Sequence, residues 1–64
     1  MIVVVYPQEY RISKERINDL AIAEFRGKSY ESTKNKGIAY FFSSEEDGQL
    51  FIEVIKVYKN EISK

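Results

Sequence analysis

The first apolar stretch of the chain is an unbroken run over residues 2–6, composed of β-branched residues and one tyrosine. Pro7 closes the run, because proline has no amide hydrogen with which to continue a ladder of hydrogen bonds. Such a run predicts a β-strand that is either covered on both faces or lies at an edge covered by another subunit. The pattern does not say beside which other strand it lies.

The second apolar stretch has helical spacing over residues 13–27. Ser13 is suited to the N-cap position, and Gly27 fits the position just beyond the helix end, where glycine readily adopts a left-handed conformation. Apolar residues recur every three or four positions between them and would form one buried stripe. They are Ile17, Leu20, Ala21 and Phe25.

Two glycine-containing motifs, Asn35-Lys36-Gly37 and Glu46-Asp47-Gly48, divide the remaining apolar residues. Both predict three-residue hairpin loops with the glycine in the left-handed position. At the second motif this loop length places Phe42 opposite Ile52, so that even-numbered residues of both strands share one apolar face. A two-residue turn would scatter those residues over both faces. The pattern therefore predicts a hairpin whose last strand covers residues 49–57.

The first motif extends the same parity to a third, weaker strand. A three-residue loop there places Lys34 opposite Ile38 and Tyr30 opposite Phe42, which brings Tyr30 onto the even-numbered face. We therefore predict a short strand over residues 29–33. An irregular loop over residues 28–36 is the alternative, since the composition of this segment is not typical of a strand.

These elements predict one α+β domain that spans residues 1–64. It has two layers, one helix packed on a small, mostly antiparallel sheet, in the order β-α-β-β-β, or β-α-β-β if the strand at residues 29–33 is absent.

A second sheet face is also apolar, at odd-numbered positions, and one helix cannot cover both faces. An apolar stripe left outside typically marks an interface, so we predict a homodimer whose second copy stacks on the sheet or extends it. The alternative is that the register slips or that a terminal segment covers the stripe. The predicted interface residues are Phe41, Phe51, Ile55 and Val57, joined by Val3 and Val5 of the first strand.

Binding of single-stranded nucleic acid is a second hypothesis for the same face. Phe41 and Phe51 would stack under bases while lysines near the first turn contact phosphates. The lysines are Lys28, Lys34 and Lys36, with Lys56 nearby on the last strand. Ten basic against ten acidic residues give no net charge, which favours a protein partner over nucleic acid.

Composition narrows the chemistry further. The chain has no cysteine and no histidine, so thiolate catalysis and the commonest general base are both excluded, and we expect neither an enzyme nor a cofactor. The acidic residues 45–47 lack the alternating ligand spacing of a calcium loop, so no metal site is expected. The longest apolar run is far too short for a membrane span. We therefore expect the cytoplasm of a cell or of an infected host.

The short length of the chain implies that a single copy is only marginally stable. For 64 residues, hydrophobic burial of about 100 kcal/mol is nearly cancelled by a conformational entropy cost of the same size. Without disulfides or metals, a second subunit is the natural source of added stability. The sequence therefore predicts a small non-enzymatic interaction or regulatory module, homodimeric and with an unidentified protein partner. Its composition resembles that of accessory proteins of phages and viruses, which is an analogy only.

Overall fold

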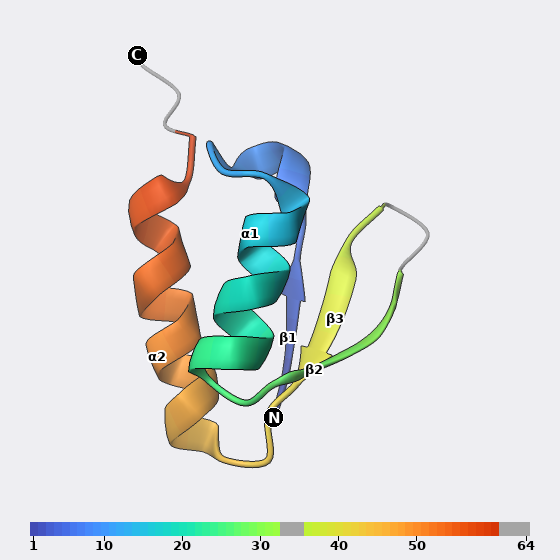
Figure 1. Cartoon of the computed structure of the whole chain (residues 1–64), viewed down its shortest axis with the longest axis vertical. Coiled ribbons are helices and arrows are strands. Elements are labelled where there is room, and N and C mark those ends of the chain that lie inside the picture. The colour runs from blue at the N-terminus through green and yellow to red at the C-terminus, as the bar shows by residue number, and fades with distance from the viewer. Residues whose placement is uncertain (33–35, 61–64) are drawn as a thin grey trace.

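The protein consists of a three-stranded antiparallel sheet with helices packed on one face (Figure 1). The computed structural model describes residues 1–32 and 36–60. The strands are β1 (Ile2–Val5), β2 (Lys28–Ser32) and β3 (Ile38–Phe41), arranged in the order β1-β3-β2. The helices are η1 (Pro7–Glu9), α1 (Lys14–Asp19), η2 (Leu20–Glu24), α2 (Glu45–Ile55) and η3 (Lys56–Tyr58). The predicted α+β class, with helix packed on antiparallel sheet, is confirmed.

The first helix begins as predicted and ends differently. Ser13 is the N-cap, and its hydroxyl accepts a hydrogen bond of 3.2 Å from the amide of Arg16. The last turn, η2, is widened into a π-helix, and the left-handed residue after it is Arg26, with φ of 60°. Gly27 is therefore not the left-handed cap. It is needed because a Cβ there would lie 2.5 Å from Cε1 of Phe42.

The predicted strand at residues 29–33 is confirmed as β2, which pairs with β3 as far as Ser32. Thr33 and the predicted partner of Ile38, Lys34, lie outside the described residues. The register differs from the prediction, because Ser32 lies opposite Ile38 and Ser29 opposite Tyr40. An extra residue between them makes a β-bulge, so Tyr30 does not oppose Phe42.

The prediction of a turn at residues 46–48 and a strand at residues 49–57 is wrong, since both belong to α2 and η3. Ser44 caps α2, and its hydroxyl accepts from the amide of Asp47 at 3.4 Å. The acidic side chains of residues 45–47 occupy the first helical turn, where the helix dipole favours negative charge. The segment that resembles a charged turn is therefore a helix start.

A glycine inside α2 has a packing role. Gly48 is buried, and a Cβ at this position would lie 2.5 Å from the sulfur of Met1, at the start of the first strand. Phe51 and Ile55 follow at helical spacing on the same buried side. The glycine thus allows α2 to approach β1 closely.

The core lies between the helices and one face of the sheet. Ile38, Tyr40 and Phe42 project into it, which confirms the predicted even-numbered core face of this strand. Phe51 of α2 lies at the centre of an aromatic cluster, with ring centroids 5.3 Å from Phe42, 5.6 Å from Tyr40 and 6.3 Å from Phe25. Both long helical segments therefore bury their apolar sides on this one face, and none of the described helices covers the other face.

Candidate functional site

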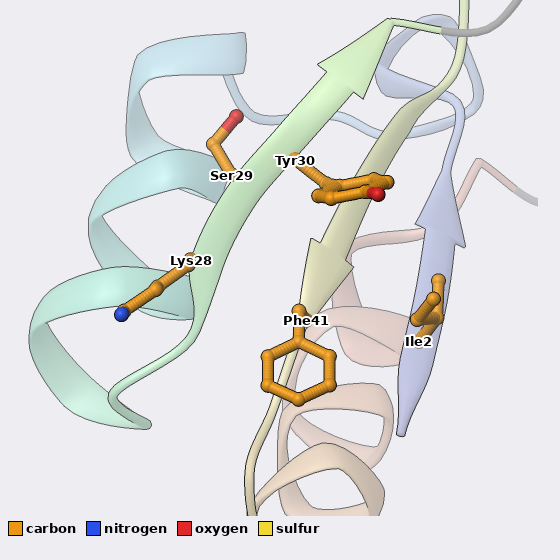
Figure 2. A pocket seen from close by; sticks show the side chains of 5 residues that line it. All are labelled: Ile2, Lys28, Ser29, Tyr30 and Phe41. Atoms are coloured by element: carbon orange, nitrogen blue, oxygen red, sulfur yellow. The ribbon is translucent and has the colours of Figure 1, made fainter.

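The bare side of the sheet, called the open face below, carries large apolar side chains from all three strands. Ile2 and Val4 of β1 are 57% and 43% exposed, and Phe41 of β3 is 43% exposed. Ile2 lies directly opposite Phe41, so these side chains are neighbours on the same face. Tyr30 of β2, 68% exposed, completes the set. Figure 2 shows the helices behind the sheet and the side chains of Ile2, Tyr30 and Phe41 in front of it.

The β-bulge in β2 explains why Tyr30 belongs to the open face. Continued without a shift from the pair of Glu31 and Ala39, the register would place Tyr30 opposite Tyr40, on the core side, but the shift gives that place to Ser29. Tyr30 is thus the residue without a ladder partner. Its ring reaches over the sheet toward β3, as Figure 2 shows.

A hollow of about 450 Å³ lies on the open face between β1 and β2. Its lining is mainly apolar, with one ammonium, one aliphatic hydroxyl and one phenol as polar groups. The lining residues are Ile2, Lys28, Ser29, Tyr30 and Phe41 (Figure 2). Such a lining suits an apolar or aromatic group that inserts beside a positive charge.

The outer edge of β1 carries backbone amide and carbonyl groups that point away from β3. Met1 and Phe42 exchange two hydrogen bonds of 2.8 Å, from the Met1 amine to the Phe42 carbonyl and from the Phe42 amide to the Met1 carbonyl. Bonded and non-bonded pairs alternate along an antiparallel ladder, so Val3 bonds to Tyr40 as well. The amide and carbonyl groups of the intervening residues, Ile2 and Val4, therefore point away from β3. Among the described strands, none pairs with that side of β1.

The titratable groups that burial perturbs lie away from the open face. Burial raises the pKa of Tyr40 to about 12, and its hydroxyl donates to Oδ1 of Asn18. Burial, followed by the charge of Glu9, raises the pKa of Tyr10. Tyr40 thus has a structural role as a hydrogen-bond donor, and Tyr10 packs against the core as a partly buried ring.

Most of the predicted interface residues are used in the core. Phe51, Ile55, Val3 and Val5 are buried beneath the helices, so their side chains are not on the open face. The prediction placed Phe51 and Ile55 outside because odd-numbered residues of a strand share one face. In the helix α2 these two residues are four positions apart and both face the core. Phe41 lies on the open face as predicted. Val57 is exposed but lies in η3, where its carbonyl accepts from the Arg11 guanidinium.

The residues predicted to contact nucleic acid do not lie together on one surface. Lys28 lines the hollow beside Phe41, whereas Phe51 is buried and cannot stack under a base. Lys36 is exposed next to the β2–β3 hairpin with φ of 66°, and Lys34 lies outside the described residues. Lys56 is on η3 and forms an exposed ion pair of 3.4 Å with Glu53.

Sequence reasoning missed three residues of the open face, namely Ile2, Val4 and Tyr30. The run over residues 2–6 is apolar at every position, so periodicity carries no signal for which side of β1 faces outward. Tyr30 reaches the open face only through the bulge, and a bulge has no mark in this sequence.

The described residues form neither a metal-binding cluster nor a membrane-spanning helix. Within residues 1–32 and 36–60, there is no group of three or more acidic side chains arranged to hold a metal ion. Over the same ranges, no helix has the length and apolar character needed to cross a membrane.

Comparisons with protein-family models, with curated proteins and with solved structures each gave no match.

Proposed function

We propose that this protein is a non-enzymatic module for protein–protein contacts, and that it forms a homodimer through the open face. The observation that carries the proposal is that Ile2, Val4, Tyr30 and Phe41 are all substantially exposed on one side of the sheet. Together they present a few hundred Å² of apolar surface, which is the size of patch that is often functional on a small protein.

The chemistry of the hollow supports binding rather than catalysis. Its described polar lining residues are Lys28, Ser29 and Tyr30, and none of the described lining residues carries a carboxylate or an imidazole. A serine nucleophile needs a base that a third group orients, and the described lining residues offer no carboxylate or imidazole for that role. A contact module of this kind fits the expected cytoplasmic setting of a cell or infected host, and also the analogy with viral accessory proteins.

Sedimentation velocity tests the proposal directly. The wild-type chain should sediment with twice the 7.5 kDa of one copy at micromolar concentration. A double variant of the open face, Ile2→Ser with Val4→Ser, should weaken the dimer ten-fold or more, since about 0.8 kcal/mol is lost for each CH₂ group no longer buried.

The matched control is Ile22→Ser. Ile22 is 46% exposed, like the open-face residues, but it lies on the helical side of the molecule. This variant should remain as dimeric as the wild type. A wild-type mass of one chain at all accessible concentrations would refute self-association.

One observation favours a second candidate, binding of single-stranded nucleic acid. The rings of Tyr30 and Phe41 lie on the open face, and Lys28 is the residue opposite Phe41 on β2. Rings of this kind can stack bases while a nearby lysine contacts a phosphate. Fluorescence anisotropy with labelled oligouridylate and oligothymidylate at low salt tests this. Binding that Tyr30→Ala weakens about ten-fold, and that declines with added salt, would support it. No binding at low salt would eliminate it.

A further inference from the structure

We infer that the second copy joins edge to edge at β1, so that two three-stranded sheets become one six-stranded sheet. This inference rests on the proposed homodimer and adds how the two copies meet. It starts from the backbone of Ile2 and Val4, whose amide and carbonyl groups point away from β3.

The two edges of the sheet differ in how well they are protected against pairing. β2 has a bulge at Tyr30, and it carries a charged residue, Lys28, beside the hollow of the open face. Both features discourage another strand from pairing with this edge. β1 has neither. Its four residues are all apolar and regular, and Pro7 comes only after the strand has ended. β1 is therefore the edge that is suited to take a partner strand.

The sequence of β1 is complementary to itself. In an antiparallel pair of two β1 strands, Ile2 of each copy lies opposite Val4 of the other, and the two Val3 residues meet on the two-fold axis. Ile2 and Val4 are the residues with outward backbone groups, so this register makes two doubly hydrogen-bonded pairs. There is no charge in the strand to oppose the pairing.

The exposure of Ile2 and Val4 also favours this arrangement, since these apolar side chains are 57% and 43% exposed and lie on the strand whose outer edge takes the second copy. Edge pairing adds backbone hydrogen bonds and flanks Ile2 and Val4 with apolar neighbours on both sides. It leaves Tyr30, Phe41 and Lys28 of both copies on one continuous face, where a further protein can bind.

Backbone substitution at one position tests the hydrogen bonds. Val4→Pro removes an amide that has no partner strand within the described part of the chain, and an edge strand tolerates proline at such a position. Two amide donors are lost per dimer, so the dissociation constant of the dimer should rise about ten-fold to a hundred-fold. Val4→Ala is the matched control, because it shortens the side chain but keeps the amide, and it should dimerise more tightly than Val4→Pro.

Disulfide trapping tests the register, even if the proline variant does not fold. The chain has no cysteine, so Val3→Cys introduces a single thiol. Residues opposed in a non-hydrogen-bonded pair have Cα atoms about 4.5 Å apart, within the range that a disulfide spans. Mild oxidation should convert Val3→Cys to a covalent dimer, while Ser29→Cys on the opposite edge should stay largely uncrosslinked.

The outcomes separate this inference from the proposed function. If the wild type sediments as a monomer, self-association and edge pairing both fail. If it sediments as a dimer but Val3→Cys does not crosslink, or folded Val4→Pro dimerises as tightly as Val4→Ala, the edge arrangement is overturned and self-association stands. Crosslinking of Val3→Cys, together with weakened dimerisation of folded Val4→Pro, supports the edge arrangement.

Discussion

Two adjacent residues at the end of η2 should respond to substitution with opposite signs. Arg26 is left-handed with φ of 60°, a conformation that costs a residue with a Cβ about 1–2 kcal/mol. Gly27 has no positive φ, yet a Cβ on it would lie 2.5 Å from Cε1 of Phe42 and 2.9 Å from the carbonyl oxygen of Ala21. We therefore expect Arg26→Gly to stabilise the protein and Gly27→Ala to destabilise it.

The magnitudes follow from the two environments. Arg26→Gly relieves the left-handed strain but adds about 0.5–1 kcal/mol of backbone entropy to the unfolded chain, which leaves a net gain of up to about 1 kcal/mol. Gly27→Ala forces a methyl group against a fully buried ring and a backbone oxygen, for which overpacking costs about 1–3 kcal/mol. The reduced entropy of the unfolded chain offsets less than about 1 kcal/mol of that cost.

Urea unfolding followed by far-ultraviolet circular dichroism measures both free energies, since the chain has no tryptophan to report by fluorescence. All variants must be compared at one protein concentration, because a dimer gains stability with concentration. For a domain of this size, about 1 kcal/mol corresponds to a shift of about 4–8 °C in Tm. A stable Gly27→Ala together with a destabilised Arg26→Gly would show that the glycine, and not the arginine, supplies the left-handed turn.

Three other predictions concern the core and the second helix. The pKa of Tyr40 is raised from 10.0 to about 12 in the folded protein, so the unfolded chain loses its proton first and stability should fall from about pH 10 to pH 12. Tyr40→Phe should remove that part of the alkaline loss in denaturation titrations, and an unchanged pH profile would contradict the assignment. Phe51→Ala should cost about 3–5 kcal/mol or abolish folding, because the ring contacts three other aromatic rings in the core. An exposed strand residue would cost far less, so a loss under about 1 kcal/mol in thermal unfolding would argue against the buried position. Ser44→Ala should cost about 0.5–2 kcal/mol by removing the cap of α2, whereas Ser43→Ala, at the exposed neighbouring position, should be nearly neutral in the same assay.

The fold class and the β3 core face could be predicted from sequence because each depends on local periodicity. Ile38, Tyr40 and Phe42 alternate with outward residues, and Ser13 begins a helical stripe that the structure confirms. The same reasoning failed over residues 45–58, where five apolar residues within six positions satisfy both strand and helix periods. The signal that could have decided the matter is Ser44 followed by three acidic residues, a typical helix start.

The sequence predicts that one apolar sheet face stays uncovered by helices, but it does not identify most of the residues on that face. The expectation of an apolar sheet face left uncovered by the helices is met, and Phe41 is on it. The side of β1 that faces outward depends on its pairing with β3, a contact across some forty residues that local pattern does not encode. Phe51 and Ile55 were misplaced because parity places strand residues correctly only if the segment is a strand.

The most direct test of how the second copy is held is hydrogen exchange of the Val4 amide, measured by nuclear magnetic resonance at two protein concentrations. This amide points away from β3 and has no partner strand within the described part of the chain. Pairing of two β1 strands predicts protection of Val4 that increases with concentration, while Val3, bonded to Tyr40, is protected throughout. A Val4 amide that exchanges at the rate of an unprotected peptide, at a concentration where the chain is dimeric by mass, would contradict the edge arrangement.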